Sequence, residues 1–359
     1  MKRSVFLVIF FAFGFLMTMA QDYSRYVDPR IGSEGLGRTF PGPCMPYGMA
    51  KPGPDAVSMP NTGWAPMPEP VKGFSQMHVS GTGGGQKYGN ILIQPFLDAG
   101  DIIQKRVDEK IALGYYACTF ENGIRTEITA SERCAFYRLD YGWKQKGKLL
   151  IDVATFLGID TIPDKRETQQ YVDSYVTCDG KYAVSGWSTV RGGWNNGGPY
   201  TVYFYLQSDV PLSNCDTPLS NCDTPLSNSD VPLANGEAPL YNKVKDSKTR
   251  LDVAFSKSTV NLKIGISHIS IAQARKNIPA CGFDAQLKNV RKTWNGKLGK
   301  IEISGTEKQK RMFYTALYHT MLMPVDKSGE NPHFSATPYY DDYYAIWDTY
   351  RTSMPLPKE

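Results

Sequence analysis

The chain has 359 residues, of which 41% are hydrophobic, 21% charged and 12% aromatic. This composition is typical of a folded protein and excludes wholesale disorder. The 40 basic and 35 acidic side chains give a net charge of +5 without a basic run, so the charge pattern does not indicate a nucleic-acid-binding protein. A chain of this length is enough for about two domains.

The first twenty residues have the pattern of a secretory signal peptide. An apolar run, Val5–Met17, follows a positively charged start, and small residues at Thr18 and Ala20 favour cleavage before Gln21. A membrane anchor is the alternative, but the run is short for a bilayer span. We therefore expect residues 1–20 to be removed and the protein to be exported, periplasmic or extracellular, with no membrane association after cleavage.

Loops and then short strands dominate the chain as far as residue 271. Glycine and proline are dense over residues 26–70, which predicts ordered turns without long helices. The many short apolar runs that follow, separated by turn signals, predict a β-sandwich over residues 21–272. The predicted strands are Asn90–Phe96, Tyr115–Phe120, Ile124–Ala130, Arg133–Tyr141, Leu149–Ala154, Tyr171–Cys178, Tyr182–Trp187, Tyr200–Leu206 and Val260–Ser270.

A seven-residue repeat lies in the sandwich region, over residues 209–240. The sequence PLSNCDT at Pro211 recurs at Pro218 and then decays through two further cycles. Proline in every cycle excludes a coiled coil. We therefore expect a duplicated, mobile surface loop.

The pattern changes to helix after Ile271. Asp284–Trp294 and Glu307–Met323 carry apolar residues at helical spacing, and Thr306 can cap the second helix. We expect these helices to expose an apolar stripe.

Seven cysteines do not define a disulfide framework, because the number is odd. None forms a C-x-x-C motif and no histidine cluster accompanies them, so a zinc site is not predicted. Cys118 and Cys134 lie on predicted strands separated by a third, so a bridge between them is not favoured. We expect mostly buried free thiols.

The glycine-rich segment Gly81–Asn90 (GTGGGQKYGN) superficially resembles a phosphate-binding loop. Tyr88 stands where a P-loop needs Ser or Thr, and the dinucleotide pattern fails in both registers. Nucleotide binding is therefore not expected. The glycines still permit close approach of the backbone to a neighbour or ligand.

Two residues of the sandwich region are candidates for binding. His78 precedes the glycine-rich segment, and a lone histidine is either a catalyst or, more commonly, a structural residue. Trp64 lies in a proline-rich loop, where its ring could stack on a sugar face or pack in the core.

The end of the chain offers charged candidates. Asp348 and Arg351 are three residues apart, which places them on one helical face. They form either a salt bridge or an acceptor–donor pair that grips the vicinal hydroxyls of a pyranose. The nearby doublet Asp341-Asp342 is interpreted as a solvated loop end.

Five segments together resemble glycoside hydrolase family 92, the exo-acting α-mannosidases. They are YVDPRIG at Tyr26, TFPGPCMPYGM at Thr39, GFSQMHVSGTGGGQKYGN at Gly73, FYTALYHTMLMP at Phe313 and WDTYR at Trp347. The resemblance implies a mainly β fold: an N-terminal β-sandwich, a helical linker and an (α/α) barrel, with the active site between them. It also implies inverting hydrolysis of terminal α-linked mannose, α-1,2 in N-glycans or mannans, with a bound calcium ion.

By this resemblance, Asp348 and Arg351 contact the mannose of the −1 subsite. Trp64 matches a substrate-side aromatic, and His78 lies in the strongest sandwich motif. Residues 273–359 correspond to the linker helices and the first helices of an incomplete barrel. No catalytic acid or base and no calcium ligand is identifiable, so we expect this chain to be inactive by itself.

Two other functions remain open from the sequence. One is a non-catalytic sandwich that binds carbohydrates or other proteins. The other is a different hydrolase or phosphorylase with the same layout, for which the failed P-loop match at Tyr88 is only weak contrary evidence.

Overall fold

The computed structural model of the chain describes most of the mature sequence. The described residues are 21–35, 37–81, 85–98, 100, 102–142, 146–158, 168–194, 197–214, 249–333, 335, 337–345 and 349. The expected signal peptide, most of the repeat, and both Asp348 and Arg351 lie outside these residues. The predictions made for them stay predictions.

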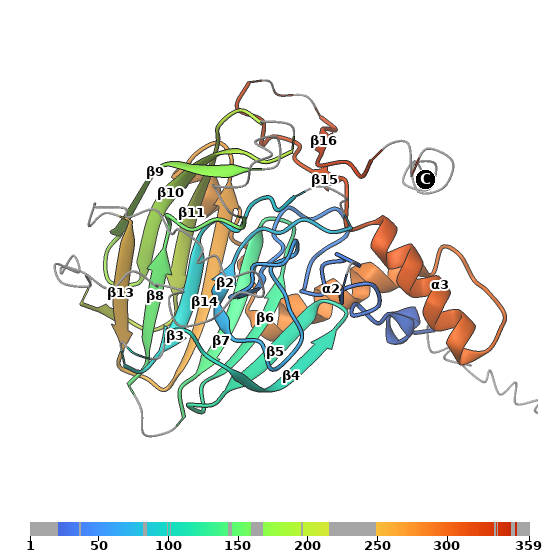
Figure 1. Ribbon diagram of the computed structural model, residues 1–359, viewed down its shortest axis with the longest axis horizontal. Helices are drawn as coiled ribbons and strands as arrows, with labels where there is room; N and C mark the ends of the chain where they lie inside the picture. Colours follow the sequence, from blue (N-terminus) through green and yellow to red (C-terminus); the bar gives the residue numbers. More distant parts are fainter. Residues whose placement is uncertain are drawn as a thin grey trace, which may run out of the picture.

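Two antiparallel sheets form a β-sandwich beside a smaller helical part (Figure 1). The six-stranded sheet runs, edge to edge, through β1 (Gly53–Ala56), β2 (Val71–Ser75), β3 (Leu92–Phe96), β8 (Lys148–Asp152), β13 (Arg250–Phe255) and β12 (Leu212–Ser213). The eight-stranded sheet runs through β4 (Arg106–Ala112), β5 (Tyr115–Phe120), β6 (Arg125–Ala130), β7 (Cys134–Asp140), β14 (Thr259–Ser267), β11 (Tyr200–Ser208), β10 (Ala183–Gly192) and β9 (Gln169–Cys178). The predicted mainly β architecture is confirmed.

The main hydrophobic core lies between the two sheets. Phe74 and Ile151 of the six-stranded sheet and Tyr137 and Ile264 of the eight-stranded sheet belong to it, and all four are fully buried. The ring centroid of Phe74 lies 6.3 Å from that of Tyr137, with the rings edge to face. Inward-facing side chains of both sheets therefore interdigitate, as in other sandwiches.

Three α-helices follow the sandwich: α1 (Ile271–Lys276), α2 (Phe283–Leu298) and α3 (Glu307–Thr320). Thr306 begins α3 with a capping box, in which its hydroxyl accepts from the amide of Gln309 and the Gln309 side chain accepts from the amide of Thr306. In Figure 1, α2 and α3 lie to one side of the sandwich, with the short 3-10 helix η1 (Tyr23–Tyr26) beside α3.

The apolar faces of α2 and α3 are covered, which makes the expectation of an exposed stripe wrong. The N-terminal segment supplies the cover, because Trp294 donates from Nε1 to the Cys44 carbonyl oxygen at 2.8 Å and its ring packs against Tyr318. Met312 is the exception and is 61% exposed. The second core contains Tyr23, Tyr26, Cys44, Met45, Val290, Trp294, Leu298, Tyr314, Leu317 and Tyr318.

The described cysteines follow the expectation with one exception. Cys44, Cys118 and Cys134 are buried free thiols and Cys281 is a half-buried one, so Cys118 and Cys134 are not bridged. Cys178 is disulfide-bonded. The two cysteines of the repeat lie outside the described residues.

A short hairpin after α3 returns the chain to the sandwich. It consists of β15 (Val325–Asp326) and β16 (Tyr340–Asp341). Between them, the buried carboxylate of Glu330 accepts from the Ser267 hydroxyl at 2.6 Å, the His268 amide at 2.9 Å and the Asn277 amide group at 2.8 Å. The hairpin is thereby fastened to the end of β14. Among the described residues, no helix combines the length and the apolar character that crossing a membrane requires.

We predict that Gly89→Ala destabilises the protein far more than Gly123→Ala. Both glycines have a positive φ, of 80° and 87°. A Cβ at Gly89 would lie 2.4 Å from the Leu157 backbone nitrogen, whereas one at Gly123 would meet nothing within 4 Å. Urea unfolding should show a loss of about 3 kcal/mol for Gly89→Ala and about 1 kcal/mol for Gly123→Ala. Equal losses would mean that the close approach at Gly89 carries no extra cost.

Candidate functional site

The candidate site lies where loops of the sandwich meet residues 339–345, just before the Trp347–Arg351 motif. We call this region the junction. At Gly81, an added Cβ would lie 3.1 Å from the Tyr344 ring, so the glycine permits the close approach predicted for this segment. The Tyr344 hydroxyl donates to the His319 carbonyl oxygen at 2.7 Å. The sandwich, α3 and the segment before Trp347 therefore converge here.

His78 is buried at the sandwich side of the junction. Its Nδ1 lies 2.7 Å from the Lys51 carbonyl oxygen and its Nε2 lies 2.8 Å from Oδ1 of Asp55. The ring also stacks on Phe40, with centroids 5.0 Å apart. Because both ring nitrogens face protein acceptors, the geometry favours the structural interpretation of His78. Its predicted contact with substrate stays a prediction.

Trp64 is also buried, with only 3% of its surface exposed. Its Nε1 donates to Oε1 of Glu109 at 3.1 Å, and the same oxygen accepts from the Tyr116 hydroxyl at 2.6 Å. Its ring belongs to the sandwich core. The burial favours packing over sugar stacking, and the sugar-binding role stays a prediction.

A buried charged cluster, which we call the clamp, dominates the junction. It consists of Lys87 and Tyr88 from the sandwich loop and Lys327, Asp341 and Asp342 from the hairpin. Oδ1 of Asp342 lies 2.9 Å from Nζ of Lys87, and its Oδ2 lies 2.9 Å from Nζ of Lys327. The Tyr88 hydroxyl donates to Oδ2 of Asp342 and accepts from Nζ of Lys327 at 3.0 Å. Nζ of Lys327 also contacts Oδ2 of Asp341 at 3.0 Å.

The clamp corrects one interpretation from the sequence. Asp342 is not part of a solvated loop end, because its side chain is only 2% exposed. Asp341 is 47% exposed and does reach solvent. Sequence spacing carries no signal for the clamp, because its sandwich residues and its hairpin residues are separated by 239 to 255 positions.

Within the clamp, charge pairing changes the pKa values of Asp342 and Lys327 more than burial does. Burial by itself raises the pKa of Asp342, but the ammonium groups of Lys327 and Lys87 hold that pKa well below its usual range. Burial likewise lowers the pKa of Lys327, but Tyr88, Asp342 and Asp341 raise it well above its usual range. The lysine and the aspartate are therefore both charged at neutral pH.

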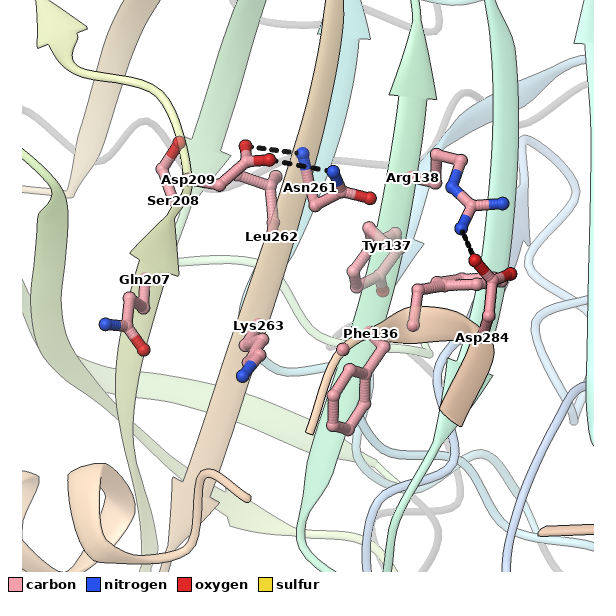
Figure 2. Close-up of a pocket in the computed structure, with 12 residues that line it drawn as sticks. Phe136, Tyr137, Arg138, Gln207, Ser208, Asp209, Asn261, Leu262, Lys263 and Asp284 are labelled. Carbon is pink, nitrogen blue, oxygen red and sulfur yellow. Dashed lines mark hydrogen bonds and ion pairs between the residues drawn. The ribbon is translucent and has the colours of Figure 1, made fainter. Parts of the chain in front are cut away.

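A separate groove of about 410 Å³ lies on the outer face of the eight-stranded sheet, beside the start of α2 (Figure 2). The carboxylate of Asp209 accepts from the backbone amide and the Nδ2 of Asn261, each at 2.8 Å. Across the groove, Arg138 pairs with Asp284 at 2.8 Å. These polar groups satisfy one another, and the groove contains none of the predicted site residues.

The described residues contain no group of three or more His, Cys, Asp or Glu side chains that could hold a metal ion. Thr349, which lies in a helical turn, donates its hydroxyl to the Ala345 carbonyl oxygen at 3.1 Å. The flanking residues Asp348 and Arg351 lie outside the described part of the chain.

Several glycosidases resemble this chain in sequence or in fold. The chain is 28% identical, over 94% of its length, to an uncharacterized secreted glycosidase of Arthroderma benhamiae. It has the fold of a family 92 α-mannosidase from Bacteroides thetaiotaomicron, with a TM-score of 0.72 and 22% identity over 93% of this chain. An inverting family 92 mannosidase from the same organism gives a TM-score of 0.64, also at 22% identity and 93% coverage.

Two sequence models of one family match consecutive parts of the chain. The glycosyl hydrolase family 92 N-terminal domain matches residues 26–267, and the family's catalytic domain matches residues 271–358. The chain belongs to glycosyl hydrolase family 92. It spans 46% of the fungal relative, 47% of the first of the two bacterial structures and 46% of the second.

Lys51, whose carbonyl oxygen contacts His78, is itself buried, and the pH dependence of stability tests that burial. Burial lowers its pKa to about 8, and its Nζ donates to the Gly48 carbonyl oxygen at 2.6 Å. Between pH 8 and 10.5 the unfolded chain binds this proton more readily than the folded chain does, so the Lys51 contribution to stability rises with pH.

We predict that Lys51→Met removes this rise. The change in the free energy of unfolding between pH 7.5 and pH 10, measured with urea, should be about 2 kcal/mol more favourable for the wild type than for the variant. The wild type should gain relative to the variant at the higher pH. Parallel profiles for the two proteins would show that Lys51 keeps an ordinary pKa.

Proposed function

We propose that the protein is an exported glycoside hydrolase of the type that releases terminal α-linked mannose from N-glycan or mannan chains, with inversion, and that this chain is inactive by itself. The observation that carries the proposal is the consecutive match of the family's N-terminal and catalytic domains on one chain. Buried, paired charges join residues of the two matched domains at the junction, which supports the proposal that the two parts act together.

Mannose is supported as the substrate by the proteins that share this fold. The two Bacteroides proteins are an α-mannosidase and an inverting mannosidase, and one further structure of the former contains mannoimidazole. Inversion requires two carboxyl groups on opposite sides of the scissile bond, with room for a water molecule. The α-1,2 preference and calcium dependence rest on the family resemblance.

Export is supported by the disulfide at Cys178, because disulfides persist in oxidising compartments. The fungal relative is described as secreted. We predict that the protein recovered from the periplasm or culture medium of its host begins at Gln21, as read by N-terminal sequencing. Recovery of the protein with residues 1–20 intact would contradict cleavage.

Asp348 and Arg351 are proposed to grip adjacent hydroxyls of the terminal mannose. A carboxylate and a guanidinium three residues apart share one helical face, and the helical turn at Thr349 supports that spacing. Each charged hydrogen bond to a sugar hydroxyl contributes about 1.5–3 kcal/mol. Loss of either side chain should therefore weaken binding substantially.

We predict that Asp348→Ala and Arg351→Ala each weaken α-mannoside binding by roughly tenfold to a hundredfold. Isothermal titration with α-1,2-mannobiose measures the affinity, and mannose release from the same disaccharide measures hydrolysis. Asp284→Ala is the control, because that carboxylate is 81% exposed and lies outside the junction. Repeating the titration after chelation with EDTA should lower affinity or activity if calcium is required.

The outcomes separate the competing functions. Mannose release would support the hydrolase and contradict the expectation that this chain is inactive by itself, whereas binding without release fits both an inactive part of a hydrolase and the non-catalytic carbohydrate-binding alternative. Phosphate-dependent release of mannose 1-phosphate would support a phosphorylase. Unchanged affinity in both variants would remove Asp348 and Arg351 from the sugar site.

A further inference from the structure

The clamp joins parts of the chain that are distant in sequence and belong to different matched domains. Tyr88 and Lys87 lie within the N-terminal domain match, whereas Lys327 and Asp342 lie within the catalytic-domain match. The side chains of Lys327 and Asp342 are 8% and 2% exposed. The contact between the domains is thus a buried charge contact at this point.

The hydrogen-bonding capacity of the Lys327 ammonium group is fully used. An ammonium group has three hydrogens to donate. Nζ of Lys327 faces three oxygens, namely the Tyr88 hydroxyl, Oδ2 of Asp341 and Oδ2 of Asp342. Two lysines and two aspartates also leave the group without net charge. Replacing Lys327 or Asp342 therefore leaves a buried partner without its counterpart.

The sandwich side of the clamp is itself held firmly. The Gln169 side chain donates to the carbonyl oxygens of Tyr88 and Leu157, and its Oε1 accepts from the Tyr200 hydroxyl at 2.8 Å. Nζ of Lys87 lies 4.4 Å from the centroid of the Trp194 ring, whose Nε1 donates to the Gly85 carbonyl oxygen at 3.2 Å. The loop that carries Lys87 and Tyr88 is thus fixed to β9 and to the ends of β10 and β11.

The other side of the clamp leads directly into the Trp347–Arg351 motif. Asp342 has a φ of 56°, so the backbone turns sharply at the clamped residue. Two residues later, the Tyr344 hydroxyl is bonded to the His319 carbonyl oxygen, and Ala345 accepts from Thr349. The segment is therefore fixed at two points immediately before the motif begins.

We propose that the clamp fixes residues 339–345, which lead to the Trp347–Arg351 motif, relative to the sandwich, and that Lys327, Tyr88 and Asp342 thereby act as positioning residues for the proposed sugar-binding pair. Its consequence for Asp348 and Arg351 rests on the proposed function. Its structural part, the coupling of the sandwich loop to the hairpin, does not. Buried ion pairs add little net stability compared with apolar side chains, but they impose one geometry on their neighbours. Such a pair suits a site that must hold a binding segment in register.

Hydrogen exchange measured by mass spectrometry on the whole chain tests the coupling. The variants are Lys327→Met, Asp342→Asn and Tyr88→Phe, the last of which removes only one hydroxyl. The control is Lys263→Met, a half-buried lysine of β14 whose Nζ donates to the Pro279 carbonyl oxygen. The reporting amides include Asp326 and Lys327, bonded to the carbonyl oxygens of Tyr47 and Tyr339, and the amides of residues 85–90.

The proposal expects local loss of protection. Exchange should accelerate about a hundredfold in residues 325–333, 337–345 and 85–90 in Lys327→Met and Asp342→Asn, and less in Tyr88→Phe. Amides of β6 and β7 should keep their wild-type protection in all variants, and Lys263→Met should match wild type in the clamp. Unchanged protection of the hairpin, or an equal loss across the whole sandwich, would overturn the coupling. Tyr88→Phe keeps the test decisive if a charge variant does not fold.

Sugar affinity tests the positioning role separately. In the folded variants, the affinity for α-1,2-mannobiose should fall at least tenfold, and Lys327→Arg should recover part of it because it retains the charge. Wild-type affinity in Tyr88→Phe and Asp342→Asn, despite locally lost protection, would overturn the positioning role and leave only the coupling. A wild-type chain that binds no mannoside would contradict the proposed function, while the exchange result would still decide the coupling.

Discussion

A buried charge must be paired, and this constraint determines how the C-terminal part of the chain meets the sandwich. Removing a carboxylate or an ammonium group from water costs several kcal/mol unless opposite charges and hydrogen bonds replace the water. Glu330 meets that requirement with groups at the end of β14 and with Asn277, and Asp342 meets it with Lys87, Tyr88 and Lys327. The hairpin between them can take few other positions without leaving a charge unpaired.

The helices depend on a different interaction, the packing of aromatic rings. Trp294 and Tyr318 lie with their ring centroids 4.6 Å apart, and Tyr26 stacks on Tyr314 at 5.4 Å. The N-terminal segment thus covers the helices that follow the sandwich. In physical terms, the cover comes from the start of the chain rather than from further helices. The same contacts hold the buried Cys44 next to Tyr318.

Much of the sandwich could be predicted from local sequence, because strand signals repeat every few residues. Tyr115–Phe120 was predicted with the bounds of β5, and α3 begins at Glu307 as expected from the cap at Thr306. β4 escaped prediction because it lies at a sheet edge and only its first residue, Arg106, is buried, so no apolar face marks it. The clamp escaped because it depends on tertiary contact alone: an Asp-Asp doublet has the same local signal in solvent and in a buried ion pair. For Trp64 and His78, local sequence already offered packing and a structural role as alternatives to substrate contact, but it could not decide between them.

The separation of the clamp partners along the chain has a consequence for folding. Tyr88 precedes Asp342 by 254 residues, so the contact closes one of the longest loops in the molecule. Long loops lose more entropy on closure, and contacts of high sequence separation form late. During synthesis the loop of residues 85–90 emerges first, and its partners β9, β10 and β11 fold well before residue 327 is made. We therefore expect the sandwich to be folded before the clamp closes and joins the hairpin to it.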